Sequence, residues 1–393
     1  MIEPKLRFKA DDGSQFPDWE EKTLGDIGTA KMCKRVLKEQ TSEKGDVPFY
    51  KIGTFGGTPD AFISRELYEE LKTKYSFPRK GNILLSAAGT IGRTVVYDGQ
   101  DAFFQDSNIV WLDNDDSVLD GFLLQFYNKT SWNNLEGGTI KRLYNGLFLS
   151  KVIHVPSIPE QQKIVEFLST IDTVIEKQKE TVATWEERKK GVMQKLFRQE
   201  VRFKADDGSN FPEWEEKKLS EMFKKVIEKN RLDLPPLTIV QGYGTIRRDE
   251  SERRIAYDEK GLKNYKAVQK DDFIVHLRSF EGGLEIANQD GIVSPAYHVY
   301  RGNDEVHPSF YYPYFRSSSF IKGKLSICVT GVRDGKNIEM GSFDELLIPH
   351  PCLAEQQKIA DCLSSLDEVI EKQKATLAAW EELKKGLLQQ MFV

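Results

Sequence analysis

The sequence repeats itself at a fixed distance of 195 residues, but only in certain segments. Residues 7–14 return as residues 202–209, and 202 − 7 = 195. Residues 160–164 (Glu-Gln-Gln-Lys-Ile) return as residues 355–359, and 355 − 160 = 195. Between these segments the two halves share almost no sequence. Because an internal repeat marks a shared structural unit, we expect one frame, built twice, that holds two different domains.

Composition limits the class of protein. A chain of 393 residues has room for two or three domains, and 39% hydrophobic with 30% charged residues is typical of a globular protein. No apolar run approaches the roughly 20 residues of a membrane span, and the N-terminal residues lack an apolar secretion signal, so we expect a cytoplasmic location. The four cysteines and five histidines show no metal-ligand spacing, which predicts reduced thiols and no metal site.

Two long helices are expected, one over 160–197 and its repeat near the C-terminus. Apolar residues recur there at heptad spacing, and each segment follows a proline-bearing stretch. We expect the two helices to pair within one chain as an antiparallel coiled coil, with Gln178 near Gln373; pairing between two chains is the alternative. The positions assigned to this helix pair and partner scaffold are Ile164, Ile171, Gln178, Trp185, Ile359, Leu366, Gln373 and Trp380.

The segments outside the helices have the texture of mixed domains. Short apolar runs such as 82–86, 94–97 and 108–112 are separated by Gly, Asp and Asn, as strands and turns are. Short helices are expected over 65–74 and 119–127. The fold class is therefore α+β: two pseudo-symmetric globular recognition domains separated by two long antiparallel helices. The predicted boundaries are 1–155 and 199–350 for the domains, and 156–198 and 351–393 for the helices.

Basic, glycine-containing loops are the candidate ligand-binding sites. The net charge of −5 argues against a nucleic-acid binder held by bulk charge alone, so DNA contact would need local patches. Arg and Lys can read guanine, Asn can read adenine, and Tyr can contact sugar or phosphate. A tight or solvated turn is the alternative for each loop. The candidates are Lys34, Arg35, Thr90, Arg93, Lys141, Arg142, Tyr144, Asn145, Arg247, Arg248, Arg278, Arg333, Lys336 and Asn337.

No catalytic constellation is found in the sequence. Residues 233–237 (Asp-Leu-Pro-Pro-Leu) come near a methyltransferase motif, but an extra leucine intervenes and no aromatic residue follows to stack a flipped base. Pro59-Asp60 with residues 70–72 imitates a nuclease metal site on what reads as an exposed helix. No phosphate-binding P-loop occurs. A lone methyltransferase or nuclease, and a structural coiled-coil dimer without a nucleic-acid role, remain the alternatives to a DNA reader.

With these residues in view, the chain resembles the specificity subunit of type I restriction–modification enzymes. The resemblance rests on the Phe-Pro-x-Trp-Glu openings at 16–20 and 211–215, the Gly-Thr-Ile-Gly loop at 89–92, and the helix entries at 159–164 and 351–359. The glycine loop is degraded in the second half, and the central helix carries no tandem short repeat. These departures leave one contact and the spacer length unassigned.

The resemblance implies a dumbbell of two recognition domains held apart by an antiparallel helix pair. Each domain would read one half of a split target in double-stranded DNA. The helices would set the gap and dock two modification subunits, which bind S-adenosylmethionine and methylate adenine. Two restriction subunits would join to translocate and cleave DNA with ATP and Mg. The chain itself would then be non-catalytic and hold no cofactor of its own.

Overall fold

The chain forms two compact units, described separately below. The computed structural model describes residues 3–132, 142–251, 259–275, 283–331 and 337–392. The first unit comprises Met1–Glu180 with Ala375–Val393, and the second comprises Thr181–Lys374. Both long helices are shared between the units, so the units cut across the predicted ranges for domains and helices, and those ranges stay a prediction.

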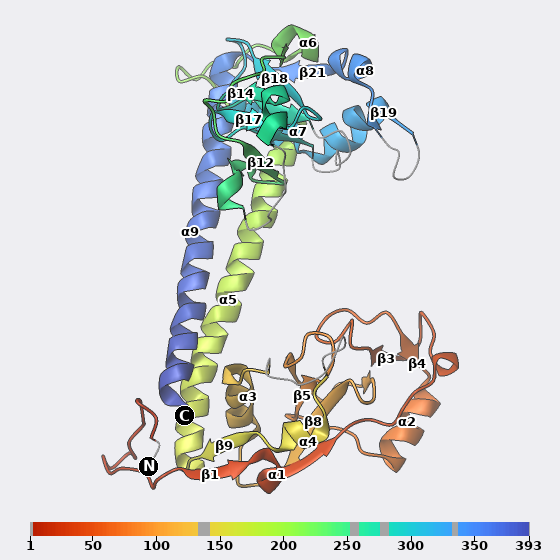
Figure 1. The fold of residues 1–393 in the computed structure, drawn as a ribbon, viewed down its shortest axis with the longest axis vertical. Helices are drawn as coiled ribbons and strands as arrows, with labels where there is room; N and C mark the ends of the chain where they lie inside the picture. Colours follow the sequence, from red (N-terminus) through yellow and green to blue (C-terminus); the bar gives the residue numbers. More distant parts are fainter. Residues whose placement is uncertain (1–2, 133–141, 252–258, 276–282, 332–336, 393) are drawn as a thin grey trace. The chain divides into compact units, whose positions relative to one another are not determined.

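The first unit is built on a four-stranded antiparallel sheet beside a smaller three-stranded sheet (Figure 1). The strand orders are β2-β8-β5-β6 and β4-β3-β7, and a separate hairpin-like pair joins β1 to β9. The strands are β1 (Glu20–Thr23), β2 (Gly28–Lys31), β3 (Val47–Tyr50), β4 (Phe62–Ile63), β5 (Ile83–Ser86), β6 (Thr94–Val96), β7 (Phe103–Phe104), β8 (Ile109–Asn114) and β9 (Val152–Val155). The helices are α1 (Leu24–Ile27), η1 (Lys38–Gln40), α2 (Arg65–Lys74), α3 (Asp120–Lys129) and α4 (Asn145–Leu149).

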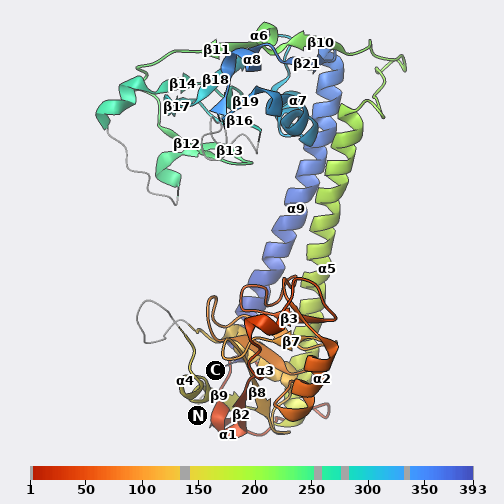
Figure 2. The same cartoon turned by 90° about the vertical axis from the view of Figure 1, so that its right-hand side faces the viewer.

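The second unit repeats this plan with a different sequence. Its main sheet has the order β11-β18-β15-β16, and β10 pairs with β21 as β1 pairs with β9. Figure 2 shows the β12–β13 hairpin beside that sheet. The strands are β10 (Glu215–Lys218), β11 (Phe223–Val226), β12 (Leu237–Val240), β13 (Gly244–Arg247), β14 (Lys266–Val268), β15 (Phe273–Val275), β16 (Leu284–Ile286), β17 (Gly291–Val293), β18 (His298–Gly302), β19 (Val329–Thr330), β20 (Asn337–Ile338) and β21 (Leu347–His350). The helices are α6 (Leu219–Met222), η2 (Arg248–Glu250), η3 (Glu259–Asn264), α7 (Pro308–Phe315), η5 (Ser319–Lys324), η6 (Leu325–Cys328) and α8 (Met340–Asp344). The four-stranded frame is thus common to both halves although their sequences differ.

The two long helices are α5 (Ile158–Phe197) and α9 (Leu353–Met391). The sequence predicted the first of them from 160, and Pro159 in fact lies in its first turn, where a missing N–H costs nothing. Pairing within the chain is antiparallel, as expected. In the first unit Lys384 contacts Asp172, and Lys179 lies 3.9 Å from Glu381, so partners descend along α9 as residues ascend along α5.

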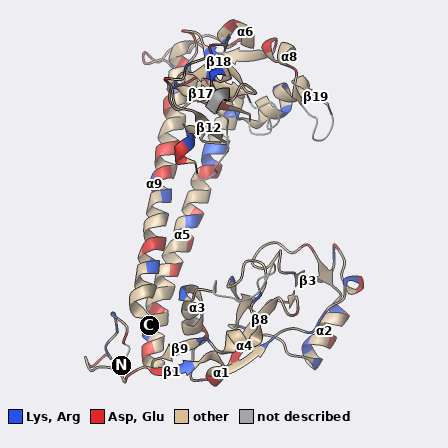
Figure 3. Cartoon of the chain, viewed as in Figure 1, with Lys and Arg blue, Asp and Glu red and all other residues tan. Residues whose placement is uncertain are grey.

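The same ion pairs recur in the second unit with the partners exchanged. Lys189 contacts Asp367, and the ammonium of Lys374 lies 3.0 Å from the carboxylate of Glu186. Each of these residues is 195 positions from its counterpart in the first unit, for example 384 − 189 = 195. Figure 3 shows the resulting alternation of acidic and basic side chains along both helices. The repeat therefore specifies a two-fold set of contacts at the level of single side chains.

Most scaffold positions predicted from the heptads are inside the cores. Ile164 and Ile171 are buried in the first unit with Trp380 packed against them, and Ile359 and Leu366 contribute to the core of the second. Trp185 is only half-buried and lies under the guanidinium of Arg188, 5.0 Å from the ring centroid. Gln178 and Gln373 belong to different units, so their opposition stays a prediction.

A buried ionic cluster joins the N-terminal segment of each half to the start of a long helix. The Glu160 carboxylate is fully buried and accepts hydrogen bonds from Arg7 Nε at 3.0 Å, Arg7 Nη2 at 2.9 Å and Trp19 Nε1 at 3.1 Å. In the second unit Glu355 accepts from Arg202 at 3.1 and 2.9 Å and from Trp214 at 2.9 Å. We call each of these three-residue sets the clamp.

The residue after each clamp glutamate is also buried, and it holds the adjoining domain. Gln161 accepts a hydrogen bond from the Leu119 amide at 2.8 Å and donates to the Ser117 carbonyl at 2.9 Å. Gln356 does the same for the His307 amide and the Glu305 carbonyl, at 2.8 and 2.9 Å. The repeated Glu-Gln pair thus faces inward, which corrects its interpretation as a mark of partner docking. Burial of polar side chains with every bond made is what their exact repetition signalled.

Candidate nucleic-acid interface

The loop between β5 and β6 is held open by two glycines and one serine. Gly89 and Gly92 have φ of 64° and 90°, values that side chains disfavour. The Ser86 hydroxyl accepts a hydrogen bond from the Arg93 amide at 2.8 Å and donates to the Thr90 carbonyl. Thr90 and Arg93 are exposed, and the Arg93 guanidinium donates to the Phe55 carbonyl at 2.7 Å. The loop therefore presents its backbone and one guanidinium to solvent in a fixed geometry.

An aromatic side chain supports this loop from behind. A Cβ atom at Gly92 would overlap the ring of Trp132, which is buried and packs on Tyr127 and Phe148. Sequence reasoning missed Trp132 as part of the site. The signal that could have found it is weak, since a lone tryptophan carries no spacing.

The second candidate loop of the first half lies beside the first. Arg142 forms an isolated antiparallel bridge with Ala88, and the Leu143 amide donates to the Ala87 carbonyl at 2.8 Å. The Arg142 guanidinium donates to the Ser107 carbonyl. Two segments more than 50 residues apart are thus brought together, which the sequence alone did not indicate. Lys141 lies outside the described residues.

The remaining first-half candidates surround this junction or sit at its edge. Tyr144 is 64% exposed and precedes α4, whose first residue is the exposed Asn145. Arg35 forms an exposed ion pair with Asp106 at 3.0 Å, next to the residue that Arg142 holds. Lys34 lies apart from these contacts, 4.7 Å from the ring centroid of Tyr75.

The second-half candidates are less clearly gathered. Arg247 binds Asp249 through two hydrogen bonds of 3.1 and 3.0 Å, and Arg248 lies 5.7 Å from the ring centroid of Tyr265. Asn337 begins β20 and is exposed. The ion pair with Asp249 raises the pKa of Arg247, so this cation is stabilised by its own chain before any ligand arrives. Arg278, Arg333 and Lys336 lie outside the described residues.

The acidic residues that imitated a nuclease site are engaged in surface ion pairs. Asp60 lies 2.8 Å from Lys51, and Glu70 lies 3.0 Å from Lys74 on helix α2. Within the described parts of the chain, no three His, Cys, Asp or Glu side chains cluster as metal ligands would. Among the same residues, no helix is long and apolar enough to cross a bilayer.

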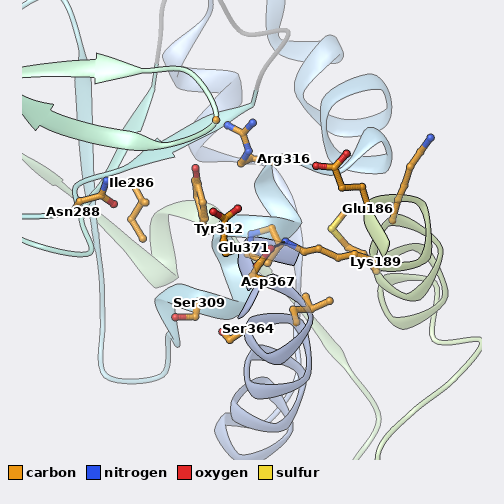
Figure 4. A pocket seen from close by; sticks show the side chains of 15 residues that line it. Glu186, Lys189, Ile286, Asn288, Ser309, Tyr312, Arg316, Ser364, Asp367 and Glu371 are labelled. Carbon is orange, nitrogen blue, oxygen red and sulfur yellow. Dashed lines mark hydrogen bonds and ion pairs between the residues drawn. The ribbon is translucent and has the colours of Figure 1, made fainter. Parts of the chain in front are cut away.

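A cavity of about 620 Å³ lies in the second unit, between the α5–α9 pair and α7. Figure 4 shows Arg316 and Tyr312 on the domain side and Lys189 with Glu186 on the α5 side. Arg316 donates to the buried carboxylate of Glu285, which also accepts from Tyr312 at 3.1 Å. The proximity of Glu285 and the burial of the ring raise the pKa of Tyr312, so this hydroxyl remains a donor. Acidic and basic side chains are mixed in this cavity.

Comparison with known proteins decides the family. A family model for the type I restriction modification DNA specificity domain matches the chain twice, over residues 17–184 and 212–379. The chain belongs to this family. The two matches are themselves offset by 212 − 17 = 195 residues, the distance between the repeated segments. The specificity domains therefore coincide with the two halves of the internal repeat.

Relatives of this specificity-domain chain include curated proteins from two organisms. A putative type I restriction enzyme specificity subunit of Haemophilus influenzae is 56% identical over 152 residues, which are 38% of this chain and 40% of that relative. The putative MjaX specificity subunit of Methanocaldococcus jannaschii is 25% identical over 97% of this chain and 94% of its own length.

Solved structures share the fold at lower identity. The crystal structure of a type I restriction–modification S subunit from M. genitalium is 15% identical, with a TM-score of 0.54 over 100% of this chain and 99% of that one. A chain from a study of assembly and conformational transition of the type I system is 14% identical, with a TM-score of 0.53 over 95% of this chain and 97% of that one. These likenesses concern the fold alone.

Proposed function

We propose that the chain is the non-catalytic specificity subunit of a type I restriction–modification complex, and that each unit reads one half of a bipartite target in double-stranded DNA. The observation that carries the proposal is the junction of the two first-half loops, where Ala88 pairs with Arg142. It places exposed Thr90, Arg93 and Tyr144 on one side-chain cluster of a domain whose family is named for DNA specificity.

The chemistry of this junction suits contact with a duplex. A thin glycine loop lets backbone amides approach a phosphate closely, and two arginines there can contact phosphates or guanine edges. The candidate residues differ between the halves, since the Arg93 loop has a glycine-rich, arginine-containing analogue but not a copy. Unlike readers on like frames would recognise unlike half-sites.

In this proposal the helix pair sets the spacer and docks two modification subunits, with two restriction subunits in the full complex. The two-fold ion pairs support it, because a frame with equivalent halves can bind two copies of one partner equivalently. S-adenosylmethionine, ATP and Mg would be bound by those partners, in the cytoplasm, where the host DNA lies.

The test begins with sequencing of methylated sites in a host that carries this subunit with its partners. Residues 25–150 are then exchanged for the corresponding segment of another specificity subunit. One half of the target should change while the other half and the spacer stay the same. A change in both halves would contradict modular reading. Methyl transfer by the purified chain without partners would favour a stand-alone enzyme, and absence of sequence-dependent DNA retention would favour a purely structural protein.

A further inference from the structure

A second groove in the second unit differs in charge from the cavity of Figure 4. It lies between the last turns of α5 and the segment that follows α7, with a volume of about 790 Å³. The α5 side is Lys190, Met193, Gln194, Phe197 and Arg198, and the other side is Arg316, Ser317, Ser318, Ser319, Lys322 and Gly323. We call it the cationic groove.

Four of the residues that line the cationic groove are Lys or Arg, and none is Asp or Glu. The neighbouring cavity is lined by Glu186, Asp367 and Glu371 as well as by basic residues. The whole chain carries a net charge of −5, so a one-sign lining is not a consequence of composition. A groove lined by one sign of charge concentrates counter-ions of the opposite sign.

The cations of the groove are differently engaged. Arg316 is anchored by the buried Glu285 carboxylate, which fixes its position. Lys190 and Arg198 are 61% and 67% exposed and lie 3.8 and 3.7 Å from acidic neighbours on their own segment. Lys322 is exposed and makes no ion pair with any residue that the structure describes. Exposed pairs at such distances are worth at most about 1 kcal/mol, so a phosphate can replace them.

The end of α5 is built so that its carbonyls do not oppose an anion. Gln199 adopts φ of 57°, its amide donates to the Leu196 carbonyl at 3.0 Å, and the Glu200 amide donates to the Lys195 carbonyl at 3.0 Å. These two bonds form the Schellman motif, which satisfies the last carbonyls of a helix. The motif also directs Arg198 at the helix terminus. Across the groove, the hydroxyls of Ser318 and Ser319 belong to exposed residues and add hydrogen-bond donors.

We propose that the cationic groove binds phosphates of the DNA backbone without reading sequence. The proposal rests on the proposed function and adds a positioning site to the second unit. The element that carries Lys322, η5, continues through η6 into β19, which pairs with β20 and its candidate residue Asn337. A phosphate held in the groove would therefore fix the duplex relative to that hairpin, because backbone contacts set register while base contacts specify.

The site belongs to the second half only. Lys190 has a counterpart in Lys385, which is 65% exposed and lies 3.5 Å from Glu382 as Lys190 lies 3.8 Å from Glu187. The counterpart of Arg198, however, is Val393. The internal repeat thus offers a matched control at the same helix position.

The test compares two double variants of the full chain, prepared with its modification partner. Lys190→Gln with Lys322→Gln removes two groove cations, and Lys195→Gln with Lys385→Gln removes two exposed cations that do not line the groove. Binding to a duplex with the mapped target and to a duplex of unrelated sequence is measured from 0.05 to 0.4 M salt. Each lost phosphate contact should lower the slope of log K against log salt by about 0.9, so the groove variant should lose roughly 30-fold in affinity at 0.15 M on both duplexes.

The control variant should change affinity less than about two-fold at the same salt, and matched melting temperatures would show that all variants fold. Equal losses in both variants would reject the groove while sequence-dependent binding by the unaltered chain kept the proposed function. A loss on the target duplex alone would show that the groove reads sequence, which also rejects the proposal. An unaltered chain that does not discriminate the two duplexes would reject both proposals.

Discussion

Removing the clamp carboxylate of the first unit should destabilise that unit strongly. Glu160→Ala leaves the Arg7 guanidinium, whose side chain is 13% exposed, without its anion, and leaves the Trp19 N–H without an acceptor. Breaking a buried pair by removal of one partner costs about 3–5 kcal/mol. Arg7 keeps hydrogen bonds to the carbonyls of Phe16 and Pro17, so we expect about 3 kcal/mol, the lower end of that range.

The measurement is urea unfolding of the full chain, followed by tryptophan fluorescence and by hydrogen exchange in each unit. Glu166→Ala, an exposed acid on the same helix, is the control and should cost less than about 0.5 kcal/mol. The paired variant Glu160→Leu with Arg7→Met should cost less than Glu160→Ala alone, because no charge is left unpaired.

The reasoning would be refuted by a loss below about 1 kcal/mol for Glu160→Ala, or by a paired variant that is as unstable as the single one. Because the contacts of Glu355 match those of Glu160 to within 0.2 Å, Glu355→Ala should produce an equal loss that is confined to the second unit. Spread of either loss over both units would show that the clamps are not local.

Three further predictions concern single contacts. Lys384→Glu should lower the melting temperature by placing two anions together, and adding Asp172→Lys should restore most of the loss; no rescue would remove this pair from the helix register. Gly92→Ala should cost about 1–3 kcal/mol in urea unfolding, since the new Cβ would displace Trp132 at a positive φ, and a neutral effect would contradict the packing. Burial lowers the pKa of His350 below its ordinary 6.5, so stability present above pH 6.5 is lost as pH falls; His350→Asn should make that decline shallower between pH 7 and 5, and an unchanged profile would exclude this histidine.

Periodic features were predictable from the sequence. Helix α2 has the bounds expected from its amphipathic pattern, Arg65–Lys74, and α3 begins one residue after the expected start at 119. The long helices followed from heptad spacing after prolines. Local periodicity reports which face is apolar, and this is sufficient to place helices and short strands.

Contacts between distant segments were not predictable. The parallel pairing of Phe49 with Phe103, and the bridge from Ala88 to Arg142, depend on chain closure that no local pattern encodes. The burial of Glu160 was also missed, because a charged residue on a helix is normally expected at the surface. Its exact repetition as Glu355 was the available signal, and it marked a structural requirement.

The division of the long helices has a consequence for synthesis on the ribosome. Phe392 stacks on Phe122 with ring centroids 5.0 Å apart, and Leu388 and Met391 are buried in the same core. The first unit therefore stays unfinished while the whole of Thr181–Lys374 is made, and that inserted stretch can complete its own fold first. At roughly 5–20 residues per second the wait is about 10–40 s. The half of the protein that emerges first is the last to close, and its apolar α3 surface must be kept from other nascent chains until then.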